Sequence, residues 1–167
     1  MIVILYNIRS LYNVGSIFRT ADAAGIEKIY LCGIAPKPID EFDRPREQLK
    51  KVSLGAEKYV PWEHCKSTSC LIDKLKRDGY KIFAVEQDKK SIPYYKIPKS
   101  YALPTGGQVL NSKFCLVLGN EVKGLPKSIL NRSDKILEIP MRGRKESLNV
   151  GVAFGIVAFH FNLANSH

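Results

Sequence analysis

Three segments of the chain place polar side chains beside glycines, just after apolar stretches, and these residues are the best suited to chemistry. Residues 13–26 read NVGSIFRTADAAGI, residues 116–126 read LVLGNEVKGLP, and residues 138–153 read EIPMRGRKESLNVGVA. Turns of this kind at the carboxyl ends of strands expose backbone amides that bind ligands in α/β proteins. The three segments are therefore the first candidates for a functional site.

The first segment predicts a helix over about residues 14–24, with Asn13 as the residue whose side-chain oxygen caps the free amides of its first turn. The apolar positions repeat at helical spacing and would face the sheet, which leaves Arg19 on another face, beside the end of the first strand. Arg19 could serve a reaction there. The alternative is an exposed arginine paired with Asp22, an interaction of roughly 0.2 to 0.5 kcal/mol.

The second segment describes a strand that ends at Gly119, a polar pair formed by Asn120 and Glu121, and a turn through Gly124 into a helix that starts with a proline. Free amides in this turn could bind a ligand, and an ordinary tight turn with a solvated glutamate is the alternative. The segment contains neither GxGxxG nor the eight-residue phosphate-binding loop pattern. A dinucleotide-binding fold and a nucleotide triphosphatase are therefore not supported.

The third segment predicts the end of a strand, a basic loop and the start of a last helix over about residues 147–163. Ser147 is predicted to cap this helix, with Asn149 just inside it. A role as a cap alone is the alternative to a chemical role for Ser147. The loop before it carries side chains that could hold phosphates: Arg142, Arg144 and Lys145.

The elements that must position these segments alternate between short β-rich runs and helical patterns. This alternation predicts an α/β fold with a mostly parallel sheet and helices on both faces. A length of 167 residues suits a single domain over 1–167. The predicted strands are residues 2–6, 28–32, 81–86, 114–119 and 135–140.

Basic residues outnumber acidic residues 26 to 16, which gives a formal charge of +10. This balance favours a polyanionic partner, although charge alone does not separate RNA from DNA or from an acidic membrane surface. Long loops rich in proline, glycine and charge are predicted at 33–47 and 87–107. Their basic residues, with Tyr94, Tyr95 and Tyr101 in the second loop, suit contacts to a nucleic-acid backbone and stacking on bases, and a solvated charged loop is the alternative.

The N-terminal stretch MIVILYN lacks a basic leader and a cleavage site, so it predicts a strand and a cytoplasmic protein. The cysteines are scattered without a CxxC pair or a histidine at zinc spacing, which predicts reduced thiols and no metal site. These residues are Cys32, Cys65, Cys70 and Cys115.

The last predicted helix is apolar on nearly every face and too short to span a bilayer. Such a helix is buried on more than one side, which favours packing against both the domain and the second subunit of a homodimer. A central helix in a monomeric core is the alternative. Gly151 and Gly155 each cost a helix roughly 1 kcal/mol relative to alanine, a cost that the close approach of another backbone would offset.

In this order and spacing, the three segments resemble the three sequence motifs of the SpoU, or TrmH-like, RNA methyltransferases of the SPOUT superfamily. The resemblance covers nearly the whole chain and includes LGAEKYVP between the first and second motifs. Two positions depart from the usual pattern, since Val122 stands where glycine is common and Gly151 where serine is common. The matching residues are Asn13, Gly15, Arg19 and Ala21, then Gly119, Glu121 and Gly124, then Pro140, Met141, Ser147, Leu148 and Asn149.

The resemblance implies a C-terminal deep trefoil knot, a homodimer formed through the C-terminal helix, and methylation of a ribose 2'-hydroxyl in RNA. It also implies S-adenosylmethionine as the methyl donor, held where loops of the knot meet, with S-adenosylhomocysteine as product. The cofactor-binding residues that it implies are Val85, Glu86, Gly119, Ile139, Met141 and Leu148. The catalytic residues that it implies are Arg19, Asn13, Glu121, Ser147 and Asn149.

The activating role falls on Arg19 by this resemblance. A guanidinium has a pKa above about 12 and is a poor base, so we expect Arg19 to stabilise the developing alkoxide and to hold an adjacent phosphate. RNA contacts are expected from Arg19 together with Arg142, Arg144 and Lys145.

No appended RNA-binding domain is expected, and transfer RNA is favoured over ribosomal RNA as the substrate because minimal members of this kind often act on it. Two alternatives stay open, namely an RNA-binding module with this fold but no activity and a SPOUT base methyltransferase. A metal-dependent or nucleotide-dependent enzyme is disfavoured, because the sequence shows no ligand clusters.

Overall fold

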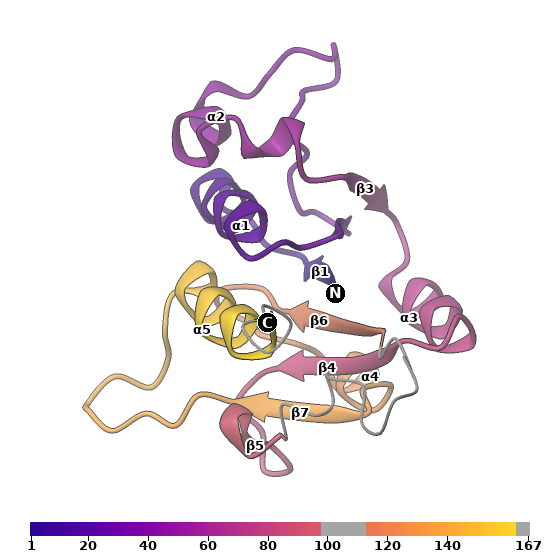
Figure 1. Ribbon diagram of the computed structural model, residues 1–167, viewed down its shortest axis with the longest axis vertical. Coiled ribbons are helices and arrows are strands. Elements are labelled where there is room, and N and C mark those ends of the chain that lie inside the picture. The colour runs from indigo at the N-terminus through magenta and orange to yellow at the C-terminus, as the bar shows by residue number, and fades with distance from the viewer. Residues whose placement is uncertain (98–112, 163–167) are drawn as a thin grey trace.

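The computed structural model describes residues 1–97 and 113–162 (Figure 1). Within these ranges one sheet has the strand order β3-β2-β1-β6-β4-β7-β5, and every neighbouring pair is parallel. The predicted α/β fold with a mostly parallel sheet is confirmed. The strands are β1 (Ile2–Tyr6), β2 (Lys28–Cys32), β3 (Trp62–Cys65), β4 (Lys81–Val85), β5 (Ile92–Pro93), β6 (Phe114–Leu118) and β7 (Lys135–Glu138).

Helices cover both faces of the sheet, as the sequence predicts. Buried residues of α1 and α5 belong to one apolar cluster, and buried residues of α3 and α4 belong to a second cluster on the other face. The helical segments are α1 (Leu11–Ala23), α2 (Glu47–Ser53), η1 (Ala56–Lys58), α3 (Thr68–Arg77), η2 (Tyr94–Lys96), α4 (Lys127–Leu130) and α5 (Val150–Asn162).

The central strands are buried on both sides. In β1, Val3 and Leu5 join the cluster under α1 and α5, whereas Ile2 and Ile4 join the cluster under α3 and α4. Side chains of a strand alternate between faces, so a strand covered on both faces must be apolar at every position. This requirement explains the uninterrupted run IVILY.

The sequence did not predict β3, α2 or β5. The strand β3 lies at the sheet edge and is only partly buried, and β5 has two residues, so neither carries a strong alternating pattern. The loop predicted over 87–107 contains β5 and η2 in its first part. Residues 98–112 of that loop, including Tyr101, lie outside the described residues.

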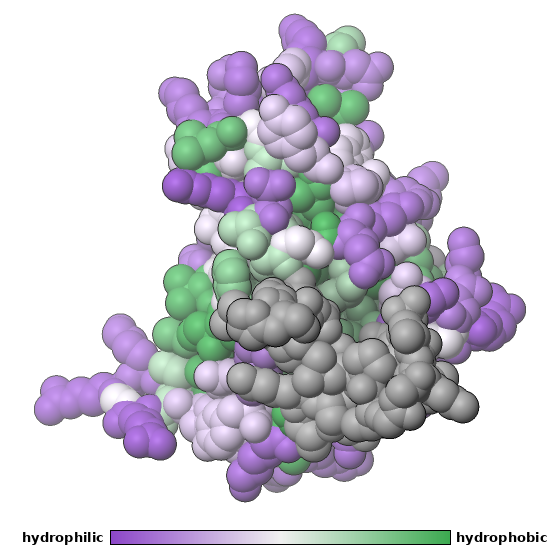
Figure 2. Space-filling view, in the orientation of Figure 1, coloured by the Kyte–Doolittle hydropathy of each residue, from purple (hydrophilic) through white to green (hydrophobic). Residues whose placement is uncertain are grey.

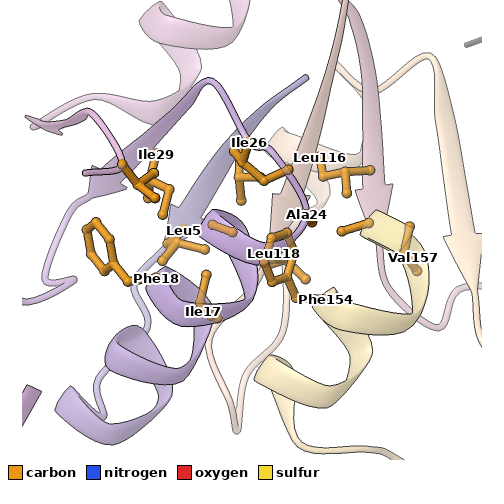
Figure 3. Packing of buried hydrophobic residues seen from close by; sticks show 14 of the residues in the cluster. Leu5, Ile17, Phe18, Ala24, Ile26, Ile29, Leu116, Leu118, Phe154 and Val157 are labelled. Atoms are coloured by element: carbon orange, nitrogen blue, oxygen red, sulfur yellow. The ribbon is translucent and has the colours of Figure 1, made fainter. Parts of the chain in front are cut away.

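The helices α1 and α5 lie side by side over the same face of the sheet (Figures 1 and 3). A Cβ built on Gly151 would lie 3.2 Å from Ser16 Oγ, and one built on Gly155 would lie 3.5 Å from Thr20 Cγ2. The close neighbour that the two glycines accommodate is therefore α1 of the same chain. The helix α5 is not buried all round, because Val152 is 52% exposed.

The cysteines are free thiols, as predicted. Burial raises the pKa of the Cys32 thiol to about 12 and also raises that of Cys115, so both remain protonated and serve as small apolar core residues. Across residues 1–97 and 113–162, no helix is long and apolar enough to cross a membrane, and no three metal-ligating side chains gather in one place.

Candidate ligand-binding site

A cavity of about 320 Å³ opens at the carboxyl ends of β4, β6 and β7. These strands are neighbours in register, with Val85 opposite both Leu118 and Leu137, so their ends are level and the loops that follow them converge. All six residues predicted to bind the cofactor line this cavity: Val85, Glu86, Gly119, Ile139, Met141 and Leu148. Four of the five predicted catalytic residues line it too: Asn13, Glu121, Ser147 and Asn149.

Two glycines make the turn after β6 possible. A Cβ on Gly119 would lie 2.6 Å from the carbonyl carbon of Gly124 and 2.8 Å from the amide nitrogen of Leu125. Gly124 has φ +62°, and a Cβ there would lie 2.4 Å from a carboxylate oxygen of Glu86. No side chain fits at either position without moving the backbone or the Glu86 carboxylate.

Glu86 fixes this turn from the neighbouring strand. Its Oε2 accepts a hydrogen bond from the Leu125 amide at 2.8 Å, and its Oε1 accepts one from the Gln87 amide at 3.0 Å. The side chain of Gln87 in turn donates to the carbonyl of Glu146, in the loop before α5. Glu86 and Gln87, at the end of β4, therefore hold in place the turn after β6 and the loop before α5, which form the other two walls of the cavity.

Glu121 joins the second segment to the start of α1. Its carboxylate accepts hydrogen bonds from the Arg9 amide at 3.0 Å, the Ser10 amide at 3.1 Å and Asn13 Nδ2 at 2.9 Å. Partial burial opposes ionisation, but the hydrogen bonds from Arg9, Asn13 and Ser10 outweigh it and lower the pKa of Glu121. The carboxylate is thus held in its charged form.

A second amide pair links the first and third segments. Asn149 Nδ2 donates to Asn13 Oδ1 at 2.9 Å, while Asn149 Oδ1 accepts from the Gly151 amide at 2.9 Å. Together with the bond from Asn13 to Glu121, this forms a chain of three side chains that we call the Glu121–Asn13–Asn149 latch. It brings together residues that are 108 and 136 positions apart in sequence.

Two predicted helix caps were wrong. Ser10 caps α1 by accepting from the Asn13 amide, so the helix begins at Leu11 and Asn13 lies inside it. At α5, the side chain of Asn149 accepts from the amides of the first turn. The observed caps lie three residues before Asn13 and two residues after Ser147. Neither Asn13 nor Ser147 caps a helix, and both line the cavity.

The predicted basic residues lie outside the cavity lining. Arg19 is exposed on α1, and among the described residues it forms no ion pair with Asp22 or any other acid. Exposed basic side chains also occupy the long loop between β7 and α5, which projects at the left of Figure 1. These are Arg142, Arg144 and Lys145.

Asn7 and Asn120 support the site and were missed as supporting residues. Asn7 has φ 52°, its Oδ1 accepts from the Ile34 amide at 3.0 Å, and its carbonyl accepts from Asn120 Nδ2 at 2.8 Å. Asparagine tolerates positive φ better than most residues, so an asparagine directly after the first strand was the available signal. This pair fixes the ends of β1 and β6 relative to each other.

The fold and cavity define a class of protein, a parallel α/β domain that binds a ligand where the loops after adjacent strands converge. A family model of the SpoU rRNA Methylase family matches residues 1–159. The chain belongs to this family, which confirms the resemblance seen in the three motifs.

Individual relatives agree with this assignment. The chain is 30% identical over 148 residues to the 23S rRNA (guanosine(2553)-2'-O)-methyltransferase RlmP of Bacillus subtilis, covering 89% of this chain and 52% of the relative. It therefore spans about half the length of that relative. An AdoMet-bound rRNA methyltransferase from Sinorhizobium meliloti superposes with a TM-score of 0.79 at 28% identity, covering 96% of this chain and 54% of the other.

A third similar protein matches this chain over almost its own full length. It comes from a structural study of the 2-OH methylation of C/U34 on tRNA, with a TM-score of 0.76 and 25% identity. The match covers 99% of this chain and 95% of that one.

Proposed function

We propose that this chain transfers a methyl group from S-adenosylmethionine to a ribose 2'-hydroxyl of RNA. The observation that carries the proposal is the cavity itself, since the three family motifs converge on it and the Glu121–Asn13–Asn149 latch joins them. Family membership and the named activities of the relatives support the same reaction.

The cavity fits this cofactor in size and chemistry. Its volume of about 320 Å³ lies within the range of roughly 300 to 1,000 Å³ that is typical of small-molecule sites. Leu118, Leu137 and Ile139 give it apolar walls suited to an adenine ring. The absence of side chains at Gly119 and Gly124 lets a ligand approach the backbone closely.

When bound, S-adenosylmethionine supplies an electrophilic methyl group, and the residues of the chain supply orientation and charge. We assign the cofactor-binding role to the loops after β4, β6 and β7. Arg19 stabilises the negative charge that develops on the ribose oxygen and holds an adjacent phosphate. Ser147 faces the cavity without a hydrogen bond to any described residue, so its hydroxyl is available to a bound ligand.

The latch residues have a positioning role in this proposal. The carboxylate of Glu121 already accepts from two backbone amides and Asn13, and its lowered pKa makes it a weak base. Asn13 and Asn149 bond to each other, and Asn149 also caps α5. All three therefore fix the cavity walls around the reacting groups.

The RNA contacts fall to Arg19 and to the basic loop before α5. Ribosomal RNA and transfer RNA both occur among the substrates named for similar proteins. We favour transfer RNA, because the protein from the tRNA study matches this chain over nearly its entire length.

A homodimer, a trefoil knot and a cytoplasmic location complete the proposal. The dimer is supported by α5, on which Val152 and Phe159 remain 52% and 37% exposed and lie seven residues apart, on one helix face. The knot is supported by membership of the SpoU rRNA Methylase family, and the location by the proposed RNA substrate. Light scattering at micromolar concentration should give twice the monomer mass, and the monomer mass would contradict the dimer.

The test of the reaction is methyl transfer from labelled S-adenosylmethionine to separate pools of unmodified transfer RNA and ribosomal RNA. Nuclease digestion and nucleoside mass spectrometry then identify the product. A 2'-O-methylated nucleoside from one pool supports the activity and identifies the substrate class. A base-methylated nucleoside, or cofactor binding without transfer to either pool, contradicts it.

A further inference from the structure

Positive charge is distributed unevenly over this protein. Residues 1–65 carry nine basic and eight acidic residues and are almost neutral. Residues 66–81 carry five basic and two acidic residues, and residues 113–135 again carry five and two, so these two ranges hold six of the ten formal net charges. They contain α3 and α4, which cover the face of the sheet opposite to α1 and α5.

Two acidic residues at the contact between α3 and α4 form internal ion pairs. Asp73 on α3 pairs with Arg132 Nε at 3.3 Å, and Asp134 pairs with Lys76 Nζ at 3.2 Å. Asp134 also accepts from the Ile82 amide at 2.7 Å, and Lys76 donates to the carbonyl of Arg132 at 3.0 Å. These contacts join α3 to the end of α4 and neutralise two cations.

Other cations of this face are not neutralised. Lys74 and Arg77 on α3 and Lys127 on α4 are exposed, and no acid among the described residues lies within ion-pair distance of them. Glu63, which feels the charge of Lys74, already pairs with Lys28 at 2.8 Å. In Figure 2 strongly hydrophilic side chains gather over α3, at the right of the view.

The chain leads from the cavity mouth to this face, but the end of α3 lies at the opposite, amino-terminal ends of the strands, where Lys76 contacts Arg132 and Asp134 just before β7. Val122 and Gly124 line the cavity, Lys123 between them is exposed, and α4 begins three residues after Gly124. A polyanion that places one unit in the cavity must therefore extend over several further units, across α4 and along the sheet, to reach α3 (Figure 1). Exposed lysine and arginine side chains bind successive phosphates of a nucleic-acid backbone and release condensed counterions.

We propose that the α3–α4 face, formed by Lys74, Arg77 and Lys127, is a second RNA-binding surface that holds the phosphate backbone beyond the methylated nucleotide. The inference rests on the proposed function, because it takes RNA as the substrate. The face contributes affinity without base specificity, since lysine and arginine contacts to phosphates carry no sequence information.

The test compares two triple variants with the same change in net charge. The test variant is Lys74→Gln, Arg77→Gln and Lys127→Gln, which spares the ion-paired Lys76 and Arg132. The control variant is Lys50→Gln, Lys51→Gln and Lys58→Gln, three exposed cations of α2 and η1 that lie outside the basic loop 33–47. Circular dichroism and cofactor titration verify that both variants fold and keep the cavity.

Binding of unmodified transfer RNA transcripts is then measured against salt concentration. Each lost phosphate contact should lower the slope of log Kobs against log salt by roughly 0.7 to 0.9, so the test variant should lose roughly 2 to 3 in slope. Its KM for RNA should rise while kcat at saturating RNA stays unchanged, and the control should keep the wild-type slope. Equal slopes in the two variants would overturn the proposal. It would also be overturned if the test variant lost affinity for vesicles containing phosphatidylserine while its RNA binding stayed intact.

The two proposals fail separately. If the wild type binds RNA through this face but methylates no RNA pool, the proposed reaction is wrong and the surface stands. If methyl transfer proceeds with an unchanged RNA KM in the test variant, the surface is wrong and the reaction stands.

Discussion

The tight turn after β6 gives the sharpest prediction, because the turn has no space for one added methyl group. In Gly119→Ala the new Cβ would lie 2.6 Å from a backbone carbon of Gly124 and 2.8 Å from the Leu125 amide nitrogen. Contacts between carbon atoms are optimal at about 3.5 to 4.0 Å, so the turn must move by about 1 Å. Gly124 and Glu86 then move as well, because the Leu125 amide is bonded to Glu86.

Forced overpacking of this kind costs about 1 to 3 kcal/mol. Since a typical domain has about 5 to 15 kcal/mol of stability, the variant should fold and can be assayed. If the distortion weakens cofactor binding by the same free energy, each 1.4 kcal/mol raises Kd about tenfold. We therefore expect cofactor affinity to fall by roughly 5-fold to more than 100-fold.

Gly143→Ala is the matched control, because a Cβ there meets nothing within 4 Å. Urea unfolding and isothermal titration with S-adenosylmethionine should therefore separate the two variants, with Gly143→Ala close to wild type. The reasoning would be refuted if Gly119→Ala equalled Gly143→Ala in both the free energy of unfolding and Kd.

Three further predictions concern the latch and Arg19. Asn149→Ala should lose about 0.5 to 2 kcal/mol of stability in urea unfolding, because Asn149 caps α5, whereas Ser147→Ala should change it little; equal losses would contradict the observed cap. Glu121→Gln should be about 1 kcal/mol less stable at neutral pH, after allowance for its exposure. Folding lowers the Glu121 pKa, so the stability that its charge contributes is present above the unfolded pKa of about 4.3 and disappears as pH falls through the folded pKa. The free energies of unfolding of wild type and variant should therefore converge in acid. A difference that stays constant with pH would show that the charge is irrelevant. Arg19→Ala should abolish methyl transfer and spare cofactor affinity, and retained turnover would remove Arg19 from the mechanism.

The latch connects the stability of the fold to the shape of the site. Glu121 accepts hydrogen bonds from the free amides of Arg9 and Ser10 before α1, and Asn149 accepts them from the first turn of α5. Each residue therefore completes a helix terminus and, through Asn13, holds its neighbour in place. A change at either end should reach the cavity wall through the starts of these helices.

The sequence alone determined the elements with strong local signals. Short runs rich in apolar residues predicted β1, β2, β4, β6 and β7. The central strands β1 and β6 are apolar throughout because they are covered on both faces, whereas β7 begins with the exposed Lys135. The glycines and polar residues after β6 and β7 predicted two of the loops that form the cavity, and the family resemblance implied the third, after β4. Six predicted cofactor-binding residues lie there because the carboxyl ends of parallel strands share one edge.

Elements whose stability depends on distant partners could not be predicted. The strand β3 is an edge strand of four residues, and β5 has two, so pairing with β2 and β7 defines them. From the sequence alone, the glycines of α5 are as compatible with a second subunit as with any other closely packed backbone. Their observed neighbours, Ser16 and Thr20, are defined only by the packing of α1 on α5.

The roles of Glu121 and Asn149 show the same division. The sequence determined that a carboxylate and an amide stand in the second and third motifs. Only the tertiary structure decided that Glu121 binds amides 111 and 112 residues away and that Asn149, rather than Ser147, caps α5. Hydrogen bonds depend on the positions and directions of donor and acceptor in space, and these positions exist only once the strands are ordered in the sheet.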